Sequence, residues 1–378
     1  MNSPTSRNAL ILSAASLLCS LALGCDKHEA QRDTDADAAP PKPKAATDDE
    51  PDLAQAVAAV GARSGAGANN GVAAGAAAGG PPPNGIFGPG EADKALAKGA
   101  PTTLTLGGDG SEPRVQLGPA PKPGSKRSGT LTIASQSDPQ QGAIPISFAL
   151  SLETQRAKTD GDAGAAAPLQ VAAKVIGATI NAPGVPPDLA GAIGKLKGSR
   201  IDYEVSADGA GSNFHYAAPK GIDPAFRDAL QGLSDTLALL ALPFPTKPVG
   251  LGGFWMVTSR DVVMGLDVVT YRLVKVEKVE GSSVELSLNT KRYAASSAFN
   301  VEGLPPDAPH VMGEFRAGGE GKLTMSAGQA FPNSGDLQSL LGAALGPAPE
   351  PSQAPGAAKP QRPMVQVQSR VTIAFSGP

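Results

Sequence analysis

The sequence predicts a mainly β protein of the α+β class, built on a curved antiparallel sheet or a barrel-like domain. Apolar residues alternate with small or polar ones in many short segments, which is the period of a strand with one buried face. Of 378 residues, 46 are Gly and 36 are Pro, whereas aromatic residues make up only 4% of the chain. Because Gly and Pro interrupt regular structure, part of the chain is expected to lie outside any packed core. We therefore expect a long disordered tether followed by one β-rich domain.

The alternation is clearest in residues 144–152 and 365–375. Even-numbered residues of the first segment are large and apolar, and so are most odd-numbered residues of the second. Shorter segments with the same period lie at 131–133, 171–175, 201–205, 284–288 and 323–325. Residues 268–276 are apolar on both faces, which predicts a central or bulged strand.

Three segments have helical spacing. The longest begins at Asp223 and Pro224, a cap followed by an N1 proline, and carries apolar residues at positions 226, 230, 233, 237 and 240 before Pro243. Its single apolar stripe predicts that it packs on the sheet. Two shorter helices are predicted at 188–197 and 336–345.

The order of these elements occurs twice along the chain. Residues 101–242 and 243–378 are each expected to form a meander closed by a helix, so that the domain at 101–378 is a pseudo-repeat. Residues 346–362 are expected to form a flexible loop in the second half.

Residues 1–24 have the layout of a secretory signal peptide, with Arg7 followed by an apolar stretch that is too short to span a bilayer. The segment Leu21-Ala22-Leu23-Gly24-Cys25 resembles the lipobox of bacterial lipoproteins. That resemblance implies cleavage before Cys25 and lipidation, including palmitate, of Cys25. The alternative is an ordinary secretory signal with an incidental cysteine.

Removal of the signal peptide leaves Cys25 as the single cysteine, because the chain has two and Cys19 lies in the signal. The expected location is the bacterial cell envelope. The domain would lie in the periplasm or at the cell surface, anchored to the inner or the outer membrane through the lipid.

Residues 25–100 are rich in Ala, Gly and Pro, and they contain one aromatic residue, Phe87. A chain of this composition cannot bury enough apolar surface to offset its conformational entropy, so it is predicted to be a disordered tether. A flexible tether of this length has a root-mean-square reach of roughly 45–50 Å.

The segment 242–255 contains the single Trp of the chain, Trp255, behind a turn rich in Pro and Gly. Pro248, Val249, Gly252 and Trp255 resemble the Pro-Val-x-x-Gly-x-x-Trp turn of a domain-of-unknown-function family of bacterial envelope proteins. The resemblance covers about residues 115–376 and implies a fold and a location, but no activity. We interpret Trp255 as a core anchor; the alternative is a platform for a ligand.

No motif for catalysis or metal binding is complete. The three histidines, His28, His215 and His310, lack the spacing of metal ligands, and the acidic runs 33–37 and 160–162 lack the later positions of a calcium loop. The Gly-Lys sequences at 191–196 and 319–324 do not satisfy the phosphate-loop pattern and are read as a helix end and a strand turn.

One acid/base pair remains open, in which His215 would lie beside Asp202 or Glu204. We expect no cofactor, no metal and no enzymatic activity. The formal charge of −3 also argues against a nucleic-acid partner.

Two functions remain. In the first, the curved sheet and a helix enclose a pocket for a hydrophobic small molecule or lipid. In the alternative, the domain is a structural or protein-interaction lipoprotein with a fully packed interior and a partner that the sequence does not identify. Small residues at Ala173, Gly177 and Ala178 allow a cavity, but they would also let a helix approach the sheet closely.

Overall fold

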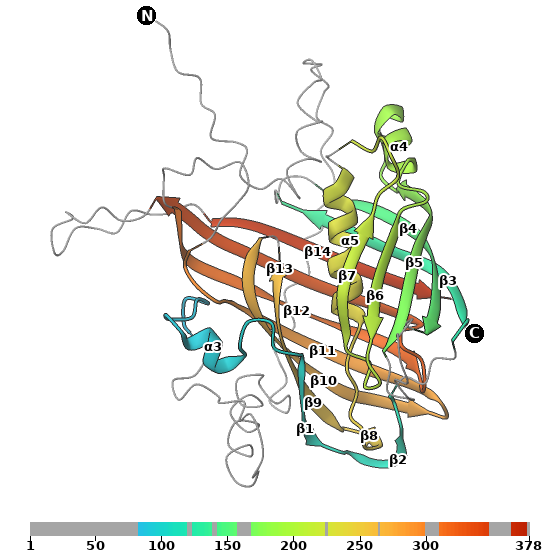
Figure 1. Ribbon diagram of the computed structural model, residues 1–378, viewed down its shortest axis with the longest axis vertical. Helices are drawn as coiled ribbons and strands as arrows, with labels where there is room; N and C mark the ends of the chain where they lie inside the picture. The colour runs from blue at the N-terminus through green and yellow to red at the C-terminus, as the bar shows by residue number, and fades with distance from the viewer. Residues whose placement is uncertain are drawn as a thin grey trace, which may run out of the picture.

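The computed structural model describes residues 82–118, 123–137, 142–156, 168–223, 226–263, 265–298, 310–347 and 364–375 (Figure 1). Within these ranges the protein is mainly β, as the sequence predicts, with twelve strands in one antiparallel sheet and two in a small second sheet. Three short helices accompany the sheets.

The large sheet consists of two meanders that lie side by side. Strands β9 to β14 are consecutive both in the chain and in the sheet, as are β3 to β7, and β14 pairs with β3. Strand β1 lies beside β9 at one edge, and β7 forms the other edge. The bounds of the first meander and β1 are β1 Thr103–Gly108, β3 Lys126–Gln136, β4 Ile144–Arg156, β5 Leu169–Ile180, β6 Arg200–Val205 and β7 Gly211–Ala217. Those of the second are β9 Phe254–Val263, β10 Leu266–Glu280, β11 Ser283–Ala294, β12 His310–Ser326, β13 Ser334–Pro347 and β14 Met364–Phe375.

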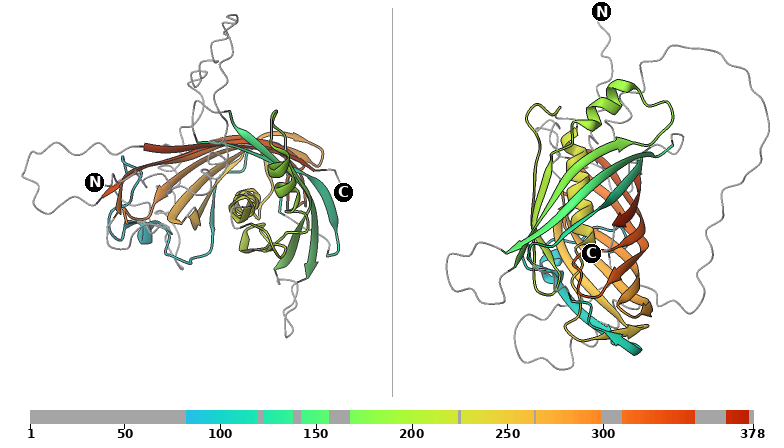
Figure 2. Two further views of the ribbon diagram at one scale, coloured as in Figure 1. Left: turned by 90° about the horizontal axis from the view of Figure 1, so that it is seen from above. Right: turned by 90° about the vertical axis from the view of Figure 1, so that its right-hand side faces the viewer.

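The sheet is strongly curved but it is not a closed barrel, because β1 and β7 do not pair with each other. Seen from above, it bends around helix α5, Arg227–Leu240 (Figure 2). We call the face toward α5 the concave face and the opposite face the convex face. The second sheet pairs β2, Ser111–Val115, with β8, Val249–Leu251.

The core lies between α5 and the concave face, and it follows directly from the alternation in the sequence. Ile146, Phe148, Leu150 and Leu152 of β4 are all buried. They belong to one apolar cluster with the leucines of α5 and with residues of ten other strands, so the period of two along each strand produces a continuous apolar surface. Strand β10 is apolar on both faces and is central, as predicted, with an irregularity in its pairing between Val276 and Lys278.

The ordered domain begins earlier than the expected boundary at residue 101. Residues 84–87 lie between the ends of β11 and β12, where Ile86 pairs in parallel with Ala294 and the amide of Phe315 donates to the carbonyl of Asn84. Helix α3, Glu91–Ala95, follows. Phe87 and Ile86 are buried, so this segment, which we call the N-terminal strap (residues 82–100), is part of the fold. The prediction that the tether extends to residue 100 is therefore wrong for these residues, because their few apolar side chains are buried against the sheet.

The predicted helix at 336–345 is also wrong, because this segment is strand β13. Leu337, Leu340, Leu341 and Ala344 have helical spacing, but β12 and β14 supply hydrogen-bonding partners along both sides of the segment. Pairing with neighbours distant in sequence overrides local spacing here.

The other two helices are confirmed with small differences in their bounds. Helix α4 spans Pro187–Gly194, and α5 begins at Arg227 rather than at residue 223. The two meanders are present, but only the first is followed by a helix on the concave face, so the expected repeat of a helix in each half is wrong. Residues 346–347 belong to β13, and the rest of the predicted loop at 346–362 lies outside the described residues.

Candidate functional site

The concave face is the first place where a binding site was expected, and α5 occupies it. Leu230, Leu233, Leu237 and Leu240 are fully buried in the main apolar cluster. Of the small residues of β5, Ala173 and Ala178 are buried in the same apolar cluster. Gly177 pairs with Ala149 on the convex side and does not line this interior. Two of the three small residues that left a cavity open in the sequence therefore belong to the packed core.

A group of charged side chains lies under the polar side of α5. Arg272 of β10 is 5% exposed, and its Nη1 donates to the carbonyl of Leu239 at 3.1 Å. This carbonyl belongs to the last turn of α5, which has no basic residue of its own, so Arg272 supplies the cation that favours a helix C-terminus. Burial lowers the pKa of Arg272 to about 10.

Arg292 of β11 lies near Arg272 on the same face, two paired positions further along the strands. Burial lowers its pKa, and Asp235 of α5 and Asp261 of β9 act against that shift. The Nε atoms of Arg272 and Arg292 are buried without a hydrogen-bond partner, and Arg292 makes no ion pair with any other described residue. Burial also raises the pKa of Asp235, which accepts a hydrogen bond from Gln231 at 2.7 Å. The interface between α5 and the sheet is thus apolar along its length and imperfectly paired at this one place.

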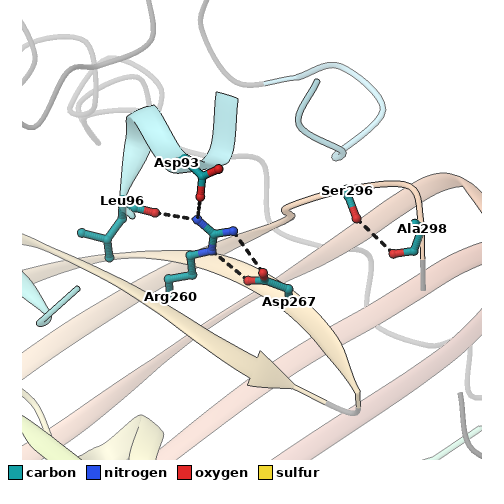
Figure 3. Close-up of polar contacts among 6 residues, drawn as sticks. All are labelled: Asp93, Leu96, Arg260, Asp267, Ser296 and Ala298. Carbon is teal, nitrogen blue, oxygen red and sulfur yellow. Dashed lines mark hydrogen bonds and ion pairs between the residues drawn. The ribbon is translucent and has the colours of Figure 1, made fainter. Parts of the chain in front are cut away.

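The N-terminal strap is held on the convex face by one guanidinium group (Figure 3). Arg260 of β9, whose side chain is 7% exposed, donates to Asp93 at 2.6 Å, to the carbonyl of Leu96 at 2.8 Å and to both oxygens of Asp267. The bonded Asp267 raises the pKa of Arg260, and Arg260 in turn lowers the pKa of Asp267. Because its described partners are two carboxylates and a carbonyl, this guanidinium group fixes α3 to the sheet through charge-assisted hydrogen bonds.

The segment around Trp255 forms a packed corner of the core. Trp255 is fully buried, its Nε1 donates to the carbonyl of Pro243 at 3.1 Å, and its ring lies 6.2 Å from that of Phe244. A Cβ on Gly250 would overlap the carbonyl oxygen of Ser111, whereas Gly252 has open space but a φ of 75°. The interpretation of Trp255 as a core anchor is confirmed. Gly250 is required because the backbone approaches it closely, and Gly252 is favoured because its φ is positive.

The expected acid/base pair is only partly assembled. His215 of β7 lies opposite Asp202 of β6 in register, but the Asp202 carboxylate accepts a hydrogen bond from Arg200 at 2.6 Å. Glu204 accepts one from Asn213 at 2.8 Å. His215 is an exposed residue of the edge strand, so these residues do not form an enclosed site.

The remaining sequence motifs do not gather into a site. Residues 191–196 form the end of α4, as predicted, but residues 319–324 lie in the middle of β12 and not in a turn. Among the described residues, no three His, Cys, Asp or Glu side chains come close enough together to hold a metal ion. The candidates Cys25, His28, 33–37 and 160–162 lie outside the described residues.

Two hollows lie outside the interior. The smaller, of about 470 Å³, is where β7 leads toward α5, and Tyr216, Lys220 and Arg227 line it. The larger, of about 910 Å³, lies across β11, β12, β13, β14 and β3, and we call it the convex depression. Its lining combines small and apolar residues, such as Gly318 and Leu340, with charged groups and with amides, among them Asn289, Gln338 and Gln368.

Sequence reasoning missed Arg260, Arg272 and the amides of the convex depression. Arg272 does carry a signal, because it is a cationic residue near the centre of β10, next to Leu273 and Val274 and within a segment that is mostly apolar on both faces. The amides carry none, since each is an ordinary polar residue at an outward position of its own strand, and only the pairing of five strands brings them together.

No helix of the described residues is both long enough and apolar enough to span a bilayer. Comparisons with known proteins add no assignment: no protein-family model matches the chain, and no curated protein matches it.

Proposed function

We propose that this protein is a lipid-anchored lipoprotein of the bacterial cell envelope, whose domain is a non-catalytic interaction module with a packed interior. The observation that carries the proposal is the position of α5, whose four fully buried leucines fill the concave side of the sheet. A ligand pocket of the usual kind is a mostly apolar cavity of some 300–1,000 Å³, and the leucines of α5 fill the space against the sheet in which such a cavity was expected. Binding is therefore assigned to the outer surface.

The anchor in this proposal is Cys25, with the chain up to the N-terminal strap as the tether. Two or more acyl chains would attach the protein almost permanently, because each buried methylene contributes about 0.8 kcal/mol. Metabolic labelling with a palmitate analogue tests this part, and Cys25→Ser should abolish the label and release the protein from membranes. Label that persists in Cys25→Ser would refute the anchor without affecting the account of the domain.

Native mass spectrometry of the mature chain carrying Cys25→Ser, exported and released without detergent, tests the packed interior. The expected spectrum contains the mass of the bare polypeptide only. A discrete adduct of lipid size would overturn the proposal in favour of the second candidate.

That second candidate is binding of a hydrophobic small molecule or lipid between the sheet and a displaced α5. The specific observation in its favour is the pair of buried guanidinium groups, Arg272 and Arg292, whose Nε atoms lack partners under the helix. An unpaired buried polar group costs free energy, so this part of the interface resists the departure of α5 less than a fully matched one would.

A further inference from the structure

The convex depression is formed by two rows of residues that cross five strands in register. The paired positions of the first row are, in order across the strands, Lys291, Gly318, Leu340, Gln368 and Gln136. Those of the second row are Asn289, Glu320, Gln338, Arg370 and Ala134. Four strand spacings make each row roughly 19 Å long. The site is thus an elongated, shallow surface suited to a chain and not to a single small molecule.

Small residues in the rows make room above the sheet. Gly318 and Ala134 project little or nothing, and longer side chains on the neighbouring strands rise around them. The volume of about 910 Å³ therefore follows from the alternation of short and long outward side chains.

Three amide side chains that face this space are free to bind a ligand. The side chains of Asn289, Gln338 and Gln368 are exposed and make no hydrogen bond with any other described residue. Each amide can donate two hydrogen bonds and accept two, which matches a hydroxyl group, because a hydroxyl also donates and accepts. Three free amides distributed over the two rows are therefore suited to a ligand that carries several hydroxyls.

The charges around the depression nearly cancel. Arg370 is paired with Asp336 at 2.7 Å, and Arg316 with Glu314 at 2.5 Å. Lys291 and Glu320, of opposite sign, are the charged outward side chains of the two rows that have no ion-pair partner among the described residues. This balance favours a neutral ligand over a polyanion, which would need a surplus of cations.

An extended peptide fits this surface less well. The five strands lie inside the sheet, so their amides and carbonyls are engaged with neighbouring strands and cannot add a further strand. Recognition has to use side chains alone. Tyr293, at one end of the depression, offers an aromatic ring with a polar tip.

We propose that the convex depression binds a neutral glycan chain. The inference rests on the proposed function and names the class of partner for that interaction module. The glycan lies across the strands, its hydroxyls bonded to Asn289, Gln338 and Gln368.

The test is binding of the mature Cys25→Ser chain to an array of neutral and acidic oligosaccharides, followed by titration with the oligosaccharide that binds. We expect binding to a neutral class, weakened about tenfold or more in the double variant Gln338→Ala/Gln368→Ala, because each lost hydrogen bond contributes modestly. Gln366→Ala is the matched control, since Gln366 is an exposed glutamine of β14 outside the depression, and its affinity should stay within about twofold of the wild type.

Binding to no neutral oligosaccharide overturns the inference, and so does undiminished binding by the double variant. Binding to acidic oligosaccharides alone also overturns the inference, because the cationic side chains of the surface would then be responsible for binding. These results are separable from failure of the proposed function, which native mass spectrometry detects as a lipid-sized adduct. Exposed glutamines make no core contact, so an unchanged urea-unfolding curve will show that the double variant is folded.

Discussion

Replacing Leu233 of α5 with alanine tests whether the helix is an integral part of the core. Leu233 is fully buried, and the change removes three methylene equivalents. At about 0.8 kcal/mol for each, the transfer contribution is about 2.4 kcal/mol. The cavity left under the helix adds to this loss, because neighbouring side chains collapse only partly into it. We expect the free energy of unfolding to fall by about 3–5 kcal/mol.

The assay is urea unfolding of the mature Cys25→Ser chain, followed by the fluorescence of Trp255. This residue is the single Trp of the chain and lies in the same apolar cluster as Leu233, so it reports on that core directly. The midpoint of thermal unfolding should fall by roughly 6–15 °C for a domain of this size. Gln231→Ala, an exposed change on the same helix, should stay within about 0.5 kcal/mol of the parent.

If Leu233→Ala lowered the free energy of unfolding by less than about 1 kcal/mol, the conclusion that α5 is packed against the sheet would be refuted. It would mean that the helix contributes little to the folded state, as expected if it leaves the sheet readily. The proposal of a packed interaction module would then give way to ligand binding under α5. The result therefore bears on function as well as on stability.

Three further predictions concern the turn, the strap and pH. Gly250→Ala should lower the free energy of unfolding by about 3 kcal/mol or more, because the added Cβ would overlap backbone atoms. Gly252→Ala should lower it by only about 1–2 kcal/mol, the cost of a left-handed φ for alanine. Equal losses in urea unfolding would contradict this difference. Arg260→Ala should cost about 3–5 kcal/mol near pH ~7. Arg260 lowers the folded-state pKa of Asp267, so the stabilisation is present above the ordinary carboxyl pKa and disappears as pH falls through the lowered value. If Arg260→Ala lost the same free energy of unfolding in acid as at neutral pH, the result would be inconsistent with this pairing. Burial raises the pKa of Tyr271 to about 12, so the folded state favours the neutral phenol and stability is lost as pH rises from about 10 toward 12. Tyr271→Phe should make the free energy of unfolding fall less steeply over this range. An unchanged slope of the free energy of unfolding against pH would disprove the prediction.

The strands could be predicted from the sequence because their signal is local. In β4 every second side chain is buried, so the alternation is visible in nine consecutive residues. The segment of β13 shows the limit of this reasoning. Its leucines fit a helix as well as a strand, and the decision is made by β12 and β14, which cannot be placed beside it from local sequence. A similar limit applies to the N-terminal strap, whose Ile86 and Phe87 stand in a segment of otherwise disorder-like composition.

The surroundings of the candidate sites could not be predicted, because their partners are far apart in the chain. Arg260 and Asp93 are 167 residues apart, and Arg272 reaches a carbonyl of α5 that lies 33 residues before it. The two rows of the convex depression need four strand pairings to be correct at once. A single error of one residue in register would turn Gln338 or Gln368 to the concave face.

The position of the N-terminal strap gives the convex depression a place relative to the proposed anchor. Pro82 and Pro83 line the depression, so the chain that comes from Cys25 enters the domain beside it. In the proposed arrangement, an anchor joined at the edge of the binding surface would keep that surface close to the membrane. The effective concentration of a glycan fixed in the same zone would then be high, so a weak and shallow site would be sufficient for attachment.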